Sequence, residues 1–365
     1  MKNLILTLSL FCCFACTNKQ PQSQSAAYTL PIDSTTQEWA QLTNIEYIPL
    51  ETTDASLIAD IFKLIYHNNT FYVFDMMGKK VLMFNRQGKF LKSIHKVGQG
   101  PGEYTNPYDM DVDDNGNIYV SDLDSHQILV YRNGNENDFQ TINPDVQFLF
   151  FAVKGEAVYL SNVYQESEMK TDLAVYTPKN QRLSVLKENT FPEGNGIPLS
   201  SHYLFRSGKE VLFHERFLPT IYRLEEDGTA SPYLQLESNQ FPDKEEITAW
   251  AKSNPQEQLM KRLQYIGDLS GCYETDKYIL LSDFSRYMLF NKETQQLYSS
   301  KQRPKPLKIL SRKIFASTGE QFISFLMPDD EIFQKSLEQM SEEEKKQLEE
   351  VSEDSNPVLV LFGFE

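Results

Sequence analysis

The chain repeats one short pattern six times, and this repetition constrains its fold more than any other feature. Each repeat contains an apolar six-residue strand, and five of the six strands end in an acidic or amide residue. A second apolar strand and then turn-forming residues follow several of them, which is typical of small antiparallel sheets. The six strands are Thr70–Asp75, Asn117–Asp122, Ala157–Asn162, Glu210–Glu215, Tyr278–Asp283 and Gln321–Leu326.

The spacing of these strands predicts a β-propeller. The closing residues at positions 75, 122, 162, 215 and 283 lie 47, 40, 53 and 68 residues apart. Four-stranded propeller blades repeat about every 40 to 50 residues. The long last interval contains residues 243–262, which read as a helical insertion because Asp243 and Glu246 form a capping-box pattern. We therefore predict an all-β, six-bladed propeller over residues 41–365 with small helical insertions.

The two ends of this domain are expected to close the ring together. A second helical insertion is predicted at about residues 330–351, where Ser341 and Glu344 form a capping box. The strand-like run 356–365 then follows and is expected to be the last strand of blade six. The early strand Ile45–Leu50 has no blade of its own, so we expect it to pair near the C-terminal strand. Loss of Pro357–Glu365 should then unfold the domain.

The N-terminus reads as an export signal. Lys2 supplies a positive charge, Leu4–Phe14 is apolar, and the small residue Ala15 follows. The apolar run is too short to span a bilayer, which takes about 20 residues. Residues 1–15 are therefore predicted to be a signal peptide.

Cys16 is the predicted site of lipid attachment. Residues 13–16 (Cys-Phe-Ala-Cys) resemble a lipobox, at which bacteria attach a diacylglycerol to the cysteine thiol. The alternative is ordinary signal cleavage with Cys16 as a spare thiol. Residues 16–40 are expected to form the lipidated N-terminus and a flexible tether, because 17–27 is polar and has no hydrophobic pattern. Only Cys272 would remain as a free thiol, so no disulfide framework is possible.

The composition excludes one class of partner. The formal net charge is −16, and the basic residues do not cluster, which argues against nucleic acid as a partner. The 24 Phe and 19 Tyr residues favour a β-rich core.

Residues 97–132 resemble one NHL-type propeller repeat, with a glycine-rich turn, a Pro, an alternating strand, a hairpin and a strand that ends in Asp. The lipobox, the IEYIPLE opening, the GQGPGEY loop and the NPVLVLFGFE ending are together similar to the six-bladed β-propeller lipoproteins of gut-type Gram-negative anaerobes. The resemblance implies a propeller that is lipidated at the outer membrane and faces the periplasm or the cell surface. It implies much less about activity, and the glycine-rich turn is missing from blades three to six.

Glu103 and Tyr104 are candidate ligand-binding residues in the loop 98–104 (Gly-Gln-Gly-Pro-Gly-Glu-Tyr). Its glycines allow backbone conformations with φ > 0. In the functional interpretation, the loop lies at the mouth of the propeller tunnel and presents Glu103 and backbone amides to a ligand. In the structural interpretation, the loop is a tight connection between blades one and two, and Tyr104 is in the core.

Asp75, Asp122 and Asp283 are further candidates because they end equivalent strands in three repeats. Two or three of these carboxylates together could line a polar tunnel and hold a cation or sugar hydroxyls. Alternatively, each caps its own hairpin with a local side-chain to backbone hydrogen bond.

The metal-binding patterns are weak. The spacing of Asp111, Asp113, Asn115 and Asp122 is similar to a calcium-binding loop, but residues 113–116 also form a good hairpin turn. The five histidines lie in different repeats and show no paired spacing. We expect no metal and no cofactor.

Three functions are compatible with these observations. The first is a non-catalytic module at the outer membrane that binds a glycan or peptide or docks a protein, since no catalytic motif is present. The second is a glycan-active hydrolase or lyase, because propeller glycosidases draw two carboxylates from separate blades and leave no linear motif. The third is a scaffold that contacts assembly partners through the acidic C-terminal helix.

Overall fold

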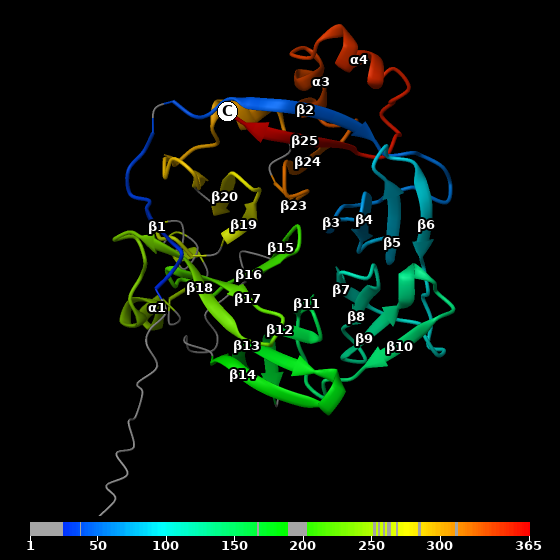
Figure 1. The fold of residues 1–365 in the computed structure, drawn as a ribbon, viewed down its shortest axis with the longest axis vertical. Helices are drawn as coiled ribbons and strands as arrows, with labels where there is room; N and C mark the ends of the chain where they lie inside the picture. Colours follow the sequence, from blue (N-terminus) through cyan, green and yellow to red (C-terminus); the bar gives the residue numbers. More distant parts are fainter. Residues whose placement is uncertain are drawn as a thin grey trace, which may run out of the picture.

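The computed structural model describes residues 25–365, except 37, 166–167, 189–202, 251–252, 255, 258–259, 261–263, 268, 284–285 and 311–312. Six mainly antiparallel sheets stand around one axis, and Figure 1 looks down that axis. The first strands of the sheets contact one another around the axis, and the later strands lie progressively further out. The predicted six-bladed, mostly β propeller is confirmed.

Blades 1 to 3 follow one another along the chain, and each is a four-stranded meander. From the axis outward, blade 1 contains β3 (Lys63–His67), β4 (Thr70–Asp75), β5 (Lys80–Asn85) and β6 (Phe90–Ile94). Blade 2 contains β7 (Pro107–Val112), β8 (Ile118–Asp122), β9 (Gln127–Tyr131) and β10 (Phe139–Ile142). Blade 3 contains β11 (Phe150–Lys154), β12 (Ala157–Gln165), β13 (Glu168–Thr177) and β14 (Arg182–Glu188).

Blades 4 to 6 use both ends of the chain. Blade 4 contains β15 (Leu204–Ser207), β16 (Glu210–His214), β17 (Thr220–Leu224), β18 (Ala230–Glu237) and, outermost, β1 (Tyr28–Pro31). Blade 5 contains β19 (Leu269–Glu274), β20 (Tyr278–Asp283), β21 (Tyr287–Asn291) and β22 (Leu297–Ser300). Blade 6 contains β23 (Ala316–Ser317), β24 (Phe322–Leu326), β25 (Val358–Phe364) and β2 (Leu42–Pro49). Short 3₁₀ turns are η1 (Arg132–Gly134), η2 (Pro178–Asn180) and η3 (Lys305–Ile309).

The repeated strands found in the sequence are the second strands of the blades, β4, β8, β12, β16, β20 and β24. Second and third strands are sandwiched between the sheets of neighbouring blades, so the apolar core lies at the blade interfaces. First strands also carry charged residues toward the axis, and their apolar pattern is therefore weaker. This difference explains why sequence reasoning found the second strand of each blade and not the first.

Blade 6 closes the ring as expected. β2 pairs antiparallel with β25, with Tyr47 opposite Val360 and Ile48 opposite Leu359. The prediction that the early strand joins the C-terminal strand is confirmed. However, β25 is the third strand of blade 6 and not the last, because β2 takes the outermost position.

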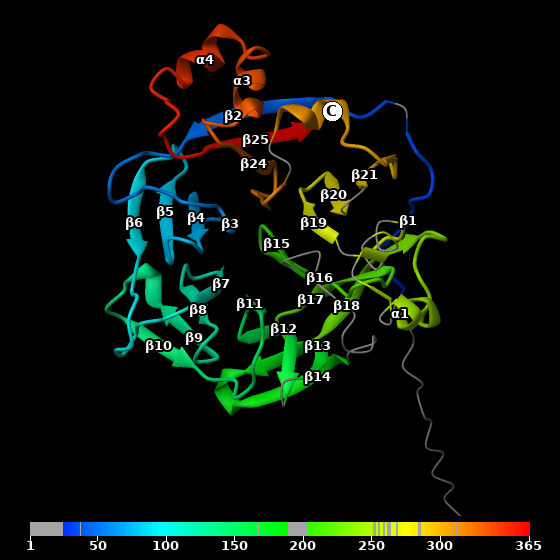
Figure 2. The ribbon, with the colours of Figure 1, turned by 180° about the vertical axis from the view of Figure 1, so that it is seen from behind.

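The helices lie outside the blades. α1 (Lys244–Trp250) follows blade 4, and its predicted capping box is present, since the Asp243 and Glu246 side chains accept each other's backbone N–H at 2.8 and 3.0 Å. The predicted stretch 330–351 is two short helices, α3 (Glu331–Leu337) and α4 (Glu342–Gln347), on the outer side of blade 6 (Figure 2). The chain breaks between them because Ser341 caps α4 in a capping box with Glu344.

Part of the segment expected to be a tether is packed against the propeller. β1 pairs in parallel with β18, and Leu30 and Ile32 are fully buried. Arg286 donates to the Ile32 carbonyl at 2.6 Å, and Trp39 is buried further along. The packed domain therefore begins at about Tyr28.

Candidate functional site

Two buried carboxylates face the axis from blade 2. Asp109 and Asp111 lie two residues apart on β7, so both side chains project from the same face of that strand. Their exposed fractions are 1% and 0%. Because a buried carboxylate is costly unless it is paired and hydrogen-bonded, the neighbouring groups determine whether this arrangement is stable.

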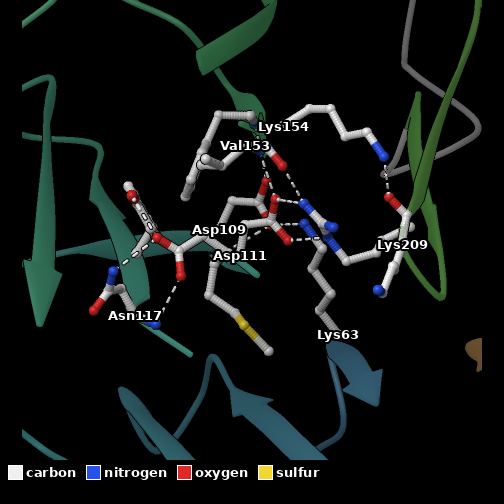
Figure 3. A network of polar contacts seen from close by, with 12 residues as sticks. Lys63, Asp109, Asp111, Asn117, Val153, Lys154 and Lys209 are labelled. Carbon is white, nitrogen blue, oxygen red and sulfur yellow. Dashed lines mark hydrogen bonds and ion pairs between the residues drawn. The ribbon is translucent and has the colours of Figure 1, made fainter. Parts of the chain in front are cut away.

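Both carboxylates are paired across blades (Figure 3). Asp109 Oδ1 lies 2.8 Å from Lys63 Nζ of β3, and its Oδ2 accepts from the Phe151 N–H of β11 at 3.0 Å. Asp111 accepts from Arg206 Nε and Nη2 of β15, both at 2.6 Å, and from the Val153 N–H at 2.7 Å. We call these four charged residues, Lys63, Asp109, Asp111 and Arg206, the axial network. It joins the first strands of blades 1 to 4.

Burial and pairing act in opposite directions on this network. Burial raises the pKa of the Asp109 carboxyl, and the nearby Lys63 ammonium opposes that rise. For Arg206, burial alone would lower the pKa of the guanidinium, but Asp111 more than offsets it, and the pKa is raised. Arg206 therefore stays charged in its buried position.

Aromatic rings from four of the six blades pack against one another at one end of the axis. Phe62, Tyr108, Phe150 and Tyr203 lie at or just before the starts of the first strands of blades 1 to 4. Successive ring centroids are 6.5, 5.6 and 6.4 Å apart, which is the range of favourable aromatic pairs. We call these four rings the aromatic collar.

A pocket lies at the opposite end of the axis, where the first strands finish. It has a volume of about 430 Å³, and turns of blades 1, 4, 5 and 6 form its wall. We call it the mouth pocket. Its lining consists of 66–68, 207–210, 274–276, 318–319, Arg223 and Lys292.

Five alternating charges form a chain of ion pairs, and all of them except Lys154 line the mouth pocket; we call them the charge ladder. Their closest N···O distances are 3.8 Å for Lys154 and Glu210, 3.4 Å for Glu210 and Arg223, 3.0 Å for Arg223 and Glu274, and 3.4 Å for Glu274 and Lys292. The ladder crosses from blade 3 through blade 4 to blade 5.

Glu274 is the best-bonded carboxylate of the ladder. Besides Arg223 and Lys292, it accepts a hydrogen bond from the Tyr233 hydroxyl, and the Arg223 guanidinium lies 3.9 Å from the centre of the Tyr233 ring. Burial and Glu274 raise the pKa of Tyr233, so its hydroxyl remains a donor. Burial alone would lower the pKa of Arg223, but Glu274, Tyr233 and Glu210 raise it. The pocket therefore offers fixed donors and acceptors.

Glu103 and Tyr104 do not line the mouth pocket. Their loop connects β6 to β7, at the collar end of the axis. Glu103 Oε2 accepts from the Gly100 N–H at 2.8 Å, and the fully buried Tyr104 donates to the Lys79 carbonyl at 2.9 Å. These contacts agree with the structural interpretation of the loop, and ligand binding by Glu103 and Tyr104 stays a prediction.

Asp75, Asp122 and Asp283 end second strands in blades 1, 2 and 5, also at the collar end. Asp75 accepts from the N–H groups of Gly78 and Ala59 at 2.7 and 2.9 Å. Asp122 accepts from the Asn106 N–H and the Ser125 hydroxyl at 2.8 and 2.9 Å. The bonds from Gly78 and Ser125 are local bonds within the hairpin turns, whereas those from Ala59 and Asn106 come from the segments that lead into the first strands. Asp283 is also buried, and ligand binding by the three residues stays a prediction.

The residues that resembled a calcium loop have other partners. Asp111 binds Arg206, and Asp113 Oδ1 accepts from the N–H groups of Asn115 and Asn117, both at 2.9 Å. The turn is thus a hairpin turn. Within the described ranges of the chain, no group of three or more His, Cys, Asp or Glu residues is placed to hold a metal ion. Cys16, the predicted lipid site, lies outside the described residues.

Sequence reasoning missed the axial network and the charge ladder. The only local signal is a charged residue inside an apolar strand, as in β7 (Pro-Tyr-Asp-Met-Asp-Val). The partners are remote: Arg206 follows Asp111 by 95 residues, and Glu274 follows Arg223 by 51. A local motif search finds no such pairs.

Comparison with solved structures supports the propeller fold. A protein from Bacteroides fragilis described as a candidate exported protein is 18% identical, with a TM-score of 0.71 over 93% of this chain and 99% of that chain. A member of the DUF4221 family from Bacteroides vulgatus is 10% identical, with a TM-score of 0.54 over 90% of this chain and 98% of that chain. At these identities the likeness concerns the fold alone.

Three further findings complete the comparison. No curated protein matches the sequence. In the part of the chain that the structure describes, no helix is both long enough and apolar enough to cross a membrane. One family pattern, described as a domain of unknown function (DUF4934), matches residues 33–363. Because this match covers most of the chain and includes strands of all six blades, the protein belongs to the DUF4934 family.

Proposed function

We propose that this protein is an exported, lipid-anchored β-propeller that binds a polar ligand, a glycan or a peptide, in the mouth pocket without transforming it. The mouth pocket carries this proposal. It encloses about 430 Å³, within the range of about 300 to 1,000 Å³ for small-molecule sites. Polar groups from four blades converge on it, which is the usual design of a specific binding site.

The carboxylates of the pocket favour binding over hydrolysis. A glycoside hydrolase needs one carboxyl that presents a proton to the leaving group and a second that acts as a nucleophile or base. Here both Glu210 and Glu274 are directed at Arg223, and Glu274 also accepts from Tyr233. The carboxylates thus hold the guanidinium in place, and the donors and acceptors around them remain for a ligand.

The axial network and the aromatic collar support a pocket with a single opening. Ion pairs join β3 and β15 to β7 at the axis, and the aromatic rings of blades 1 to 4 pack together at its far end. A ligand in the mouth pocket would therefore enter and leave on the same side. Such a blind pocket suits the end of a chain or a small molecule.

Export and lipid attachment are supported by the N-terminal sequence. The apolar run, the Cys-Phe-Ala-Cys sequence at 13–16 and the polar segment 17–27 have the order expected of a lipoprotein. The packed domain begins at about Tyr28, so the eleven residues 17–27 would form the tether. A flexible chain of that length spans about 18 Å on average, which would hold the propeller close to the membrane.

The binding proposal is tested with the chain from residue 25. Neutral and acidic oligosaccharides and short peptides are screened by thermal shift, because a ligand that binds only the native state raises the melting temperature. Arg223→Met removes the central guanidinium of the pocket and should abolish the shift. Arg182→Met, at an exposed position of β14, is the matched control and should retain it. If no compound shifts the melting temperature, the scaffold function becomes the better explanation.

The anchor is tested separately in cells. The full-length chain should incorporate labelled fatty acid and appear in the membrane fraction. Cys16→Ser should incorporate none and should be released from that fraction. A full-length chain that is exported but takes up no label would contradict lipidation and leave the binding proposal unaffected.

A further inference from the structure

The charge ladder indicates which chemical group of a ligand the mouth pocket would bind. We infer that the ligand carries a carboxylate and that Lys292 Nζ binds it. This inference rests on the proposed function and adds to it the charge of the ligand and the residue that binds the charged group.

The ladder carries one uncompensated positive charge. Its three cations, Lys154, Arg223 and Lys292, alternate with the two carboxylates of Glu210 and Glu274. A cation therefore stands at each end. On the pocket rim, the exposed side chains of Lys209 and Asp276 carry opposite charges, so they leave this excess unchanged.

The two ends of the ladder differ in their free hydrogen-bonding capacity. Lys154 Nζ already donates to the Lys209 carbonyl at 2.6 Å, and its side chain is 10% exposed. Lys292 Nζ has one partner among the described residues, Glu274 Oε2, at the long distance of 3.4 Å. An ammonium has three donors, so Lys292 retains two of them at the pocket wall.

Glu274 does not depend on Lys292. Its Oε1 accepts from Arg223 at 3.0 Å, and its Oε2 accepts from the Tyr233 hydroxyl. Lys292 Nζ can therefore donate hydrogen bonds to a ligand while Glu274 keeps its other partners. His67 Nε2, which belongs to the blade 1 side of the pocket, is buried and has no hydrogen-bond partner among the described residues.

The single excess positive charge of the ladder favours a ligand with a carboxylate over a ligand with a phosphate monoester. A single negative charge neutralises the excess of the ladder, whereas a dianion would be repelled by the carboxylates of Glu210 and Glu274. A carboxylate can come from a uronic acid of a glycan or from the free C-terminus of a peptide. Both sources present the same group to Lys292, and paired probes distinguish them.

The test measures binding by calorimetry to the chain from residue 25. One pair of probes is methyl galacturonoside and its methyl ester, and the other is N-acetyl-trialanine and its C-terminal amide. Each pair has nearly the same shape and differs in charge. One of the two acids should bind, and its neutral partner should bind about tenfold more weakly or worse, as expected for loss of a charge-assisted hydrogen bond. Added salt should weaken binding of the acid.

Lys292→Gln identifies the residue. It should remove the difference between acid and neutral partner, while Lys179→Gln, at an exposed position of η2 outside the pocket, should preserve it. Circular dichroism and the melting temperature show that both variants fold. The inference is overturned if a neutral probe binds as well as its acid, if no acid binds at millimolar concentration, or if Lys292→Gln weakens both members of a pair equally. If neutral compounds bind to the native protein but not to Arg223→Met, the proposed function is supported although this inference fails.

Discussion

Arg206→Met tests whether the axial network holds the ring together. The Arg206 and Asp111 side chains are 8% and 1% exposed, and two hydrogen bonds of 2.6 Å join them. Methionine keeps most of the apolar stem but leaves the Asp111 carboxylate with the Val153 N–H as its remaining described partner. Removing one partner of a buried ion pair costs about 3 to 5 kcal/mol. This loss is a large part of a total stability of about 5 to 15 kcal/mol.

Urea unfolding followed by the fluorescence of Trp39 and Trp250 measures this loss, since both indoles are buried and report on packing. The double variant Arg206→Met, Asp111→Asn should be more stable than the sum of the single effects predicts, by about 2 kcal/mol, because no unpaired charge remains buried.

Arg132→Met is the matched control. Its ion pair with Asp138 is half exposed, at 49% for each side chain, and should contribute about 1 kcal/mol or less. If Arg206→Met costs no more than this control, or if the two axial effects simply add, the network does not stabilise the propeller in the way argued here.

Three further predictions concern other parts of the fold. Deleting 357–365 should give a chain that is unfolded by circular dichroism, because five consecutive side chains of β25 are fully buried and each contributes about 1.5 to 3 kcal/mol of stability. A truncated chain that still folds would contradict the proposed role of β25 in closing the ring. Burial raises the pKa of the Cys272 thiol, so iodoacetamide should not label the native chain at pH 7 or 9, whereas the urea-unfolded chain should react. Only the unfolded thiol ionises near pH 8.5, so the free energy of unfolding should decrease as the pH rises above about 8.5. The decrease should be smaller in Cys272→Ala, and equal pH dependence of the two proteins would refute this. Gly102→Ala should lower the free energy of unfolding by about 1 to 3 kcal/mol, because φ is +73° and the new Cβ would lie 2.6 Å from the Phe139 ring. A smaller loss of stability than that caused by Gly100→Ala would contradict this prediction.

Local patterns in the sequence were enough to predict the architecture. Second strands such as β4 and β20 are apolar along most of their length because sheets cover both of their faces, and this pattern repeats at blade spacing. The capping boxes at Asp243 and Ser341 were predictable because a cap involves residues three positions apart. Ring closure followed from two unpaired terminal strands, each of which must satisfy its backbone hydrogen bonds.

Local patterns also explain where the site prediction differs from the geometry. Asp75 and Asp122 drew attention because they end strands in several repeats, but an Asp at a strand end commonly accepts hydrogen bonds from the turn that follows, here from the Gly78 N–H and the Ser125 hydroxyl. The glycine-rich loop is unusual in sequence, and its tight bends place Tyr104 in the core. Both patterns are consequences of turns, which leave the same kind of signal as a binding loop.

The sequence by itself determined the second strands, the number of blades and the pairing of the two terminal strands that closes the ring, because hydrophobic patterns and turn chemistry act over a few residues. Only the tertiary structure decided which polar groups meet. Asp111 and Arg206 are 95 residues apart in the sequence, and Arg223 and Glu274 are 51 apart. They come into contact because closing the ring brings strands and turns of different blades together around one axis. A charge inside a strand signals that a partner exists, and the geometry of the ring determines which residue it is.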